Sequence, residues 1–117
     1  MKFLPLLLGS TVFVALAAHA AAGVSPSADS HQPVAIQKFA FAPKEITITA
    51  GTTLVWTNHD ETPHTIIATD GSFVSKAMDT DDRYEHMFAT AGDYNYFCTL
   101  HPYMTGTIHV RAASAGR

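Results

Sequence analysis

A thiol, an imidazole and a thioether lie within seven residues of one another near the end of the 117-residue chain. Cys98, His101 and Met104 are separated by two residues in each interval, in the order Cys-x2-His-x2-Met. A short loop with this spacing can direct all three side chains into one pocket. Sulfur and imidazole ligands together favour copper over calcium or magnesium, which take oxygen ligands. The loop therefore predicts three ligands of one copper ion.

A fourth ligand has to come from another part of the chain, and His64 is the best candidate. It follows Pro63 at the end of a polar loop and precedes an apolar stretch. If two sheet ends meet there, His64, Cys98 and His101 could form a trigonal set with Met104 as a weak axial ligand. Such a set is associated with one-electron transfer, in which copper cycles between Cu(I) and Cu(II).

Cys98 is the only cysteine. In an exported protein an odd cysteine is a metal ligand, a reactive thiol or half of an intermolecular disulfide. A cysteine hydrolase is disfavoured because no glycine-rich segment that could form an oxyanion hole flanks Cys98. One cysteine, two histidines and a methionine also make a poor zinc set. A copper chaperone or storage protein is the alternative function, although methionine and histidine form no cluster outside the loop.

The N-terminus predicts export. Lys2 precedes an apolar stretch over residues 3–18, after which small residues accumulate. This order is typical of a signal peptide, here residues 1–22 with cleavage near residues 20–22. The stretch is short for a membrane anchor of about 20 apolar residues, so we expect a periplasmic protein without stable membrane association after cleavage. Residues 23–32 are expected to be a flexible lead, 33–111 one domain and 112–117 a flexible tail.

The charge balance is mildly acidic. The chain has 7 Lys and Arg against 10 Asp and Glu, a net charge of −3. This disfavours a nucleic-acid partner, since surfaces that bind nucleic acid are basic. Acidic residues at positions 60, 61, 79, 81 and 82 could steer a basic protein partner, or could be only a solvated loop. No feature demands a dimer, so we expect a monomer.

Between the lead and the tail, apolar residues recur with the period of two that is typical of strands. Strands are expected over residues 34–41, 44–49, 65–68, 84–89, 94–98 and 105–111, with another that includes Leu54, Trp56 and Asn58; residues 73–77 are irregular or a short strand. Seven or eight short strands with regular turns, and no segment that predicts a helix in the mature domain, predict an all-β fold, an antiparallel sandwich of two sheets.

The remaining histidines are expected to lie outside the copper site. His59 stands in the polar loop and should be exposed, and His31 belongs to the predicted lead. His109 lies on the polar face of the last expected strand and should face solvent. His86 lies on the same face as Phe88 and should point inward.

With these motifs the chain resembles the cupredoxins, and within them the amicyanin-like group, whose ligand loop has the same two-residue intervals. The resemblance covers roughly residues 34–110. It includes Phe-Ala-Pro at 41–43, Ile-Thr-Ile-Thr-Ala-Gly at 46–51, Trp-Thr-Asn at 56–58, Pro-His-Thr at 63–65, Ala-Gly-Asp-Tyr-Asn-Tyr at 91–96 and the loop at 98–106. The chain departs from the group in a shorter segment between His64 and Tyr84 and in Phe97 before the cysteine, which leaves the particular redox partner open.

The resemblance implies a Greek-key β-sandwich that holds one type 1 (blue) copper ion, with His64, Cys98, His101 and Met104 as ligands. It implies that the backbone N–H of Thr65 donates to the sulfur of Cys98 and that the ring edge of His101 reaches the surface as the port for the electron. A protein of this kind is a one-electron carrier and not an enzyme. Its partners are transient redox proteins, for example a cytochrome c or a periplasmic oxidoreductase.

Overall fold

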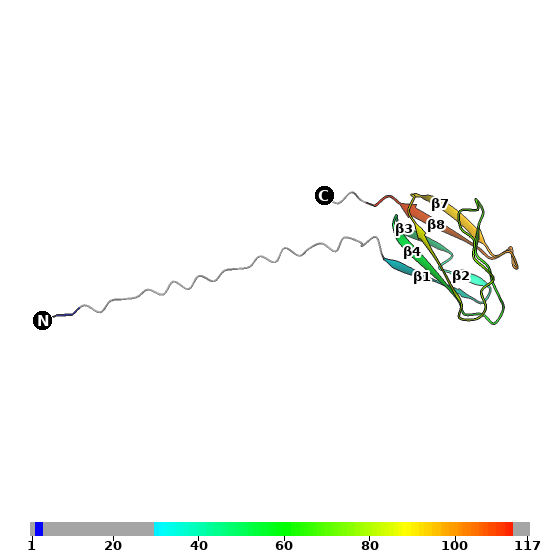
Figure 1. Cartoon of the computed structure of the whole chain (residues 1–117), viewed down its shortest axis with the longest axis horizontal. Helices are drawn as coiled ribbons and strands as arrows, with labels where there is room; N and C mark the ends of the chain where they lie inside the picture. The colour runs from blue at the N-terminus through cyan, green and yellow to red at the C-terminus, as the bar shows by residue number, and fades with distance from the viewer. Residues whose placement is uncertain (1, 4–29, 114–117) are drawn as a thin grey trace.

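Eight β-strands form the regular secondary structure of the computed structural model, which describes residues 2–3 and 30–113 (Figure 1). The strands are β1 (His31–Gln37), β2 (Ala40–Ala42), β3 (Glu45–Thr49), β4 (Thr52–Asn58), β5 (Ile67–Ala68), β6 (Arg83–Phe88), β7 (Gly92–Phe97) and β8 (Thr105–Arg111). The all-β prediction is confirmed. Within these described residues there is no helix long and apolar enough to cross a membrane. The predicted signal peptide lies outside the described residues apart from residues 2 and 3, as do residues 23–29 and 114–117.

The strands form two four-stranded sheets, one with the order β2-β1-β4-β6 and the other with the order β3-β8-β7-β5. The prediction of a β-sandwich is confirmed. The prediction of a purely antiparallel arrangement is wrong, because β1 runs parallel to β4 and β3 runs parallel to β8. The chain changes sheet after β2 and again after β3, so β4 returns beside β1 in the same direction. A period of two reports which face of a strand is buried, and it says nothing about strand direction.

Several strand boundaries differ from the prediction. β1 begins at His31, which pairs with Thr53 of β4, so the flexible lead predicted for residues 23–32 is wrong at its last two positions. The strand predicted at residues 65–68 is only the two-residue β5, and residues 73–77 contribute an isolated bridge between Val74 and Ile67. Hydrogen bonds to side chains and loops satisfy the backbone here in place of a long ladder, and periodicity does not report such partners.

The strand predicted over residues 34–41 is a hairpin. Lys38 and Phe39 alone connect β1 to β2, with φ angles of 52° and 56°, and Gln37 pairs with Ala40. A two-residue hairpin loop of this type needs positive φ at both positions. For residues with a Cβ the left-handed conformation costs roughly 1–2 kcal/mol each, which is why the sequence, with no glycine or asparagine there, reads as one continuous strand. Contacts elsewhere must therefore hold this turn.

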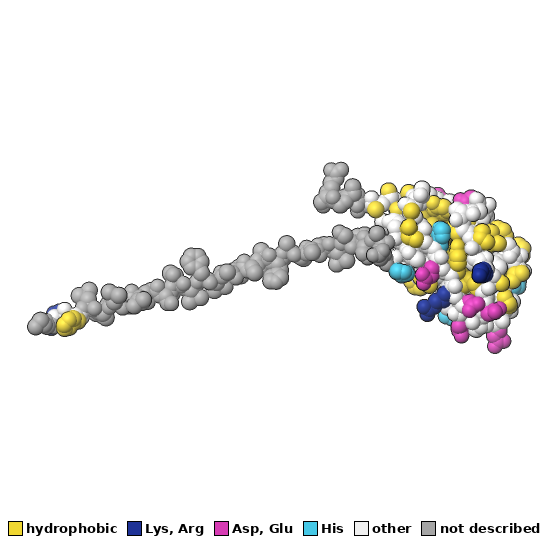
Figure 2. Space-filling view, viewed as in Figure 1, with side chains coloured by type: hydrophobic (Ala, Val, Ile, Leu, Met, Phe, Trp, Pro, Cys, Tyr) yellow, Lys and Arg dark blue, Asp and Glu magenta, His cyan; other side chains and the backbone are white. Residues whose placement is uncertain are grey.

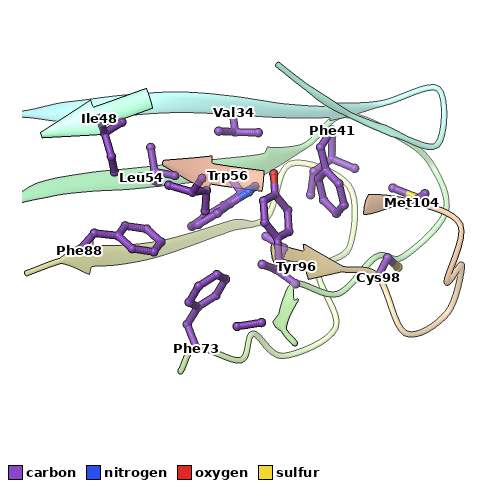
Figure 3. Close-up of a cluster of buried hydrophobic side chains, with 14 of the residues drawn as sticks. Val34, Phe41, Ile48, Leu54, Trp56, Phe73, Phe88, Tyr96, Cys98 and Met104 are labelled. Carbon is purple, nitrogen blue, oxygen red and sulfur yellow. The ribbon is translucent and has the colours of Figure 1, made fainter. Parts of the chain in front are cut away.

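Trp56 lies at the centre of the core between the two sheets (Figure 3). Its side chain is fully buried, and the ring centroids of Tyr84, Tyr96 and Phe73 lie 5.5, 5.6 and 5.9 Å from its own. Burying a large apolar side chain of this kind contributes about 1.5–3 kcal/mol to folding. Cys98 and Met104 lie together at one end of this core, so the packing of the sandwich supports the base of the loop that carries them (Figure 3).

His109 joins three strands of the second sheet. Its Nε2 lies 2.7 Å from a carboxylate oxygen of Glu45 on β3, and its Nδ1 lies 2.7 Å from one of Asp93 on β7, to which Arg111 also donates. The side chain is 24% exposed, so the prediction that it faces solvent is confirmed in part. The hydrogen bonds to Glu45 and Asp93 raise the pKa of His109 above its ordinary value, and those from His109 and Arg111 lower the pKa of Asp93.

The stability of the metal-free domain is expected to depend on pH through His109. Because the folded-state pKa of His109 is raised, its stabilising effect is complete below the ordinary histidine pKa of about 6.5 and is lost as the pH rises through the folded-state pKa. Urea unfolding of the wild type and of His109→Gln measures the effect. The difference between the two midpoints should be largest just below neutral pH and should shrink in alkaline buffer; a difference that stays constant over this range contradicts the prediction.

Candidate metal centre

The potential ligand atoms of His64, Cys98 and His101 converge at one end of the sandwich, all within 4.8 Å of one another. The sulfur of Cys98 lies 3.7 Å from Nδ1 of His64 and 3.8 Å from Nδ1 of His101. His64 and Cys98 are buried, whereas His101 is partly exposed. Three of the four residues that the sequence predicts as ligands are therefore brought together from two separate parts of the chain.

The sulfur–nitrogen distances fit one metal ion that lies in the plane of the three donor atoms. Zinc, whose bond lengths are close to those of copper, binds thiolate at about 2.3 Å and imidazole at about 2.0 Å. If the sulfur–metal–nitrogen angle is about 120°, the sulfur and the nitrogen lie roughly 3.7 Å apart. The sulfur–nitrogen distances agree with this value. The donor set holds one cysteine sulfur and two imidazoles and no carboxylate, which suits copper better than calcium or magnesium.

Backbone hydrogen bonds fold the loop from Cys98 to Met104 back on itself. The N–H of Cys98 donates to the carbonyl of Met104 at 3.1 Å, the N–H of His101 to the carbonyl of Cys98 at 3.2 Å, and the N–H of Met104 to the carbonyl of His101 at 2.8 Å. The loop leaves β7 and enters β8 directly, so both of its ends are fixed by one antiparallel pair. Met104 is buried at the same end of the core as Cys98 (Figure 3). The short loop thus keeps Cys98, His101 and Met104 at one end of the sandwich, and the role of Met104 as a ligand stays a prediction.

Thr65 ties this loop to the segment that carries His64. Its backbone N–H donates to the sulfur of Cys98 at 3.3 Å, which confirms the contact that the resemblance implied. Its hydroxyl oxygen accepts a hydrogen bond from the N–H of Thr99 at 2.8 Å and also lies 2.8 Å from the hydroxyl of Thr99. Because a buried polar group needs a hydrogen-bond partner, Thr65 both satisfies the sulfur of Cys98 and positions the loop.

Asn58, fully buried at the end of β4, fixes the loop that leads to His64. Its Nδ2 donates to the carbonyls of Thr62 at 3.0 Å and Met78 at 2.9 Å, and its Oδ1 accepts from the N–H of Asp60 at 2.9 Å. His64 and Met78 exchange backbone hydrogen bonds of 3.1 and 2.8 Å. This role of Asn58 was not predicted from the sequence. An asparagine on the buried face of an alternating strand is the signal for it, because a buried amide needs partners.

Asp60 makes contacts that the sequence did not predict. Its carboxylate accepts hydrogen bonds from the backbone N–H groups of Lys38 and Phe39, at 2.7 and 2.9 Å, and one of its oxygens lies 2.9 Å from Nε2 of His64. Partial burial acts to raise the pKa of Asp60, but the donors from Phe39, His64 and Lys38 outweigh it and lower the pKa below its ordinary value. Its side chain is only 14% exposed, so it does not belong to a solvated acidic flank.

Phe39 is a second contact of the site that the sequence missed. Its ring meets the imidazole of His64 edge to face, with centroids 5.4 Å apart, and that of His101 likewise at 5.1 Å. Phe39 is 40% exposed, and Leu100 and Tyr103 on the ligand loop are more exposed still. An apolar surface therefore surrounds the partly exposed His101. The sequence could not place Phe39 here because its position depends on the turn between β1 and β2.

The other charged and imidazole side chains take different places. His59 is exposed as predicted, and His86 is half-buried against the rings of Phe73 and Phe88, with centroids 5.1 and 4.8 Å from its own. Burial lowers the pKa of His86 below its ordinary value. The acidic residues at 61, 79, 81 and 82 are exposed. Figure 2 shows acidic side chains gathered at one end of the domain, beside an area where hydrophobic side chains predominate.

An all-β sandwich with a buried cysteine and two imidazoles at one end of its core is the architecture of a small copper protein. The model of the cupredoxin-like domain family matches residues 6–110, and the chain belongs to the cupredoxin family. Its cofactor is one type 1 copper ion.

Relatives and a solved structure agree with this family. The chain is 31% identical to amicyanin-alpha of Methylorubrum extorquens, over 94% of this chain and 97% of that protein. It is 38% identical to amicyanin of Paracoccus versutus over 66% of this chain and 62% of that protein, so the match spans less than two thirds of that relative. The Cu(I) structure of a methionine-to-alanine mutant of amicyanin superimposes with a TM-score of 0.65 at 27% identity, covering 68% of this chain and 80% of that one.

Proposed function

We propose that this protein is an exported, periplasmic blue copper protein that carries single electrons between redox partners and is not itself an enzyme. Its ligands are His64, Cys98 and His101 in a plane, with Met104 as the weak axial ligand. The observation that carries the proposal is the convergence of the first three donor atoms within 4.8 Å. Copper supplies a one-electron couple, and a structure of the related amicyanin in a Cu(I) form supports the use of that couple here.

The protein's own residues suit electron transfer in two ways. His64, Cys98 and Met104 are buried, so water has little access to the pocket. Hydrogen bonds from Asn58, Thr65 and the loop backbone fix the donors, so the pocket keeps one shape in both oxidation states and little reorganisation accompanies transfer. His101 alone among these residues is partly exposed, and its ring is the port for the electron.

Docking is proposed to be brief and to use the apolar surface around His101. Phe39, Leu100 and Tyr103 are 40%, 53% and 70% exposed there. A small apolar patch suits a weak, transient partner, such as a cytochrome c or a periplasmic oxidoreductase, and the protein is proposed to act as a monomer. The predicted signal peptide, residues 1–22, supports export to the periplasm.

The proposal is tested by loading the mature domain with one equivalent of Cu(II) and recording its visible and EPR spectra. We expect an intense blue thiolate-to-copper band with narrow copper hyperfine splitting. The electron self-exchange rate and the rate of copper release to a competing chelator are then compared. Fast exchange with slow release supports an electron carrier, whereas rapid release with slow exchange would favour the alternative, a copper chaperone or storage protein. A pale protein with an ordinary copper spectrum would refute both the ligand set and the carrier.

A further inference from the structure

The carboxylate of Asp60 connects two parts of the molecule that are distant in sequence. Its Oδ1 accepts from the N–H of Lys38 at 2.7 Å, and its Oδ2 accepts from the N–H of Phe39 at 2.9 Å. The same Oδ2 lies 2.9 Å from Nε2 of His64. One side chain thus holds both residues of the β1–β2 turn and the imidazole of a proposed copper ligand.

The contact with Asp60 decides which nitrogen of His64 is free. An ionised carboxylate only accepts hydrogen bonds, so Nε2 must carry the proton. Nδ1, which faces the sulfur of Cys98 at 3.7 Å, then keeps its lone pair for a metal. A carboxylate behind a ligand histidine fixes the tautomer and the ring orientation in many metal sites.

The contact with the turn decides where Phe39 lies. Lys38 and Phe39 both have positive φ, a conformation that residues with a Cβ rarely adopt and that persists only where neighbours enforce it. Asp60 supplies an acceptor to each of the two N–H groups. The turn therefore places the ring of Phe39 edge-on to the imidazoles of both His64 and His101.

We propose that Asp60 is a positioning residue of the metal centre, which orients the imidazole of His64 and holds the ring of Phe39 across both proposed histidine ligands. Phe39 belongs to the apolar surface at which a redox partner would dock. The carboxylate of Asp60 therefore holds part of this surface in a fixed position relative to His64. This inference rests on the proposed ligand set and deepens the proposed function, because it assigns part of the docking surface to a residue outside the ligand loop.

The first test uses the metal-free domain, so it does not depend on copper chemistry. Amide hydrogen exchange and histidine tautomers are measured by NMR for the wild type, Asp60→Ala and Asp60→Asn. In Asp60→Ala the amides of Lys38 and Phe39 should exchange about tenfold to a hundredfold faster, which corresponds to loss of a hydrogen bond to a charged acceptor. The signal of the proton on Nε2 of His64 should be lost to exchange with water.

Asp60→Asn separates the two roles and covers the case in which Asp60→Ala fails to fold. The amide retains one acceptor oxygen, which can serve Phe39 and His64, while its NH2 group meets the N–H of Lys38. Exchange of the Lys38 amide should therefore quicken while Nε2 of His64 keeps its proton. Asp81→Asn is the matched control, since it removes the same charge from an exposed residue whose φ of 68° asparagine tolerates.

The second test uses the copper-loaded variants. Loss of a carboxylate behind a ligand typically lowers metal affinity about tenfold to a hundredfold, and we expect this loss for Cu(II) in Asp60→Ala, with a smaller loss for Cu(I). Each tenfold difference between the two would raise the reduction potential by about 59 mV. Asp81→Asn should leave both affinities within about twofold of the wild type, because it changes only an exposed side-chain charge and keeps the backbone N–H that donates to Asn58.

The inference is overturned if Asp60→Ala, or Asp60→Asn where the former does not fold, leaves the amide exchange of the turn unchanged. It is also overturned if Asp81→Asn shifts the copper affinities as much as Asp60→Ala does, because loss of charge alone would then account for the effect. A wild type that binds no copper but shows the expected exchange changes would refute the proposed function and still support the tie between Asp60, His64 and the turn.

Discussion

Cys98→Ser is expected to abolish the intense visible band of the copper-loaded domain completely. The band requires a thiolate bonded to Cu(II), and Cys98 is the only cysteine in the chain. Serine has nearly the same shape but offers a hard hydroxyl in place of a soft thiolate, so copper affinity should fall by more than the tenfold to hundredfold that follows loss of a residue behind a ligand. Visible spectroscopy and competition with a Cu(I) chelator measure the two effects.

Met104→Leu is the matched control for Cys98→Ser. It conserves volume at another buried position of the same loop and leaves the thiolate in place. The visible band should therefore persist, although its energy and the reduction potential should shift because the proposed axial ligand is gone. Circular dichroism of both metal-free variants verifies that the sandwich is intact. A Cys98→Ser protein that stays blue would show that the sulfur is not a ligand.

The candidate ligands on the loop could be proposed from the sequence because their chemistry is local. Cys98, His101 and Met104 lie on one loop, and the loop is fixed at both ends by β7 and β8. His64 was harder, since only the three-dimensional structure shows its Nδ1 beside the sulfur of Cys98. A polar loop that ends in Pro-His before an apolar stretch was a sufficient signal.

The contacts around the site could not be predicted in the same way. Asp60 stands in a run of polar residues that reads as a solvated loop, and its partners are the backbone of a distant turn. The sequence does not predict that turn either, because the strand-like pattern continues through Lys38 and Phe39 and no glycine or asparagine marks a turn there. Positive φ at such residues depends on tertiary contacts and not on local preference.

The fold shows the same division between local pattern and long-range pairing. Alternation located β3, β4, β6, β7 and β8 to within a few residues. It could not reveal that β3 pairs in parallel with β8 in one sheet while β4 pairs in parallel with β1 in the other. Buried strands show the same side-chain period whichever way their neighbours run.

Gly106→Ala is expected to destabilise the metal-free domain by about 1–3 kcal/mol, the usual cost of overpacking a core. Gly106 is buried opposite Tyr96 in the β7–β8 register, and an added Cβ would overlap Cζ, Oη and Cε1 of the Tyr96 ring. The φ of Gly106 lies outside the left-handed region, so the cost is steric and not a matter of backbone conformation. Urea unfolding measures it.

The ring of Tyr96 has no room to move away from an alanine at position 106. It is 1% exposed and lies 4.6 Å from the ring centroid of Phe41 and 5.6 Å from that of Trp56. Burial also raises the pKa of Tyr96 to about 12, so the hydroxyl stays neutral over the working range of pH. Any movement of this ring would disturb the centre of the core.

A double-mutant cycle shows whether the clash with Tyr96 is the cause. Tyr96→Leu removes the overlapping atoms, so Gly106→Ala should cost at least about 1 kcal/mol less in that background than in the wild type. An equal cost in both backgrounds would mean that another contact of Gly106 is responsible. Because Gly106 is two residues from Met104, Gly106→Ala should also shift the visible spectrum of the copper-loaded domain, and Tyr96→Leu should partly reverse that shift.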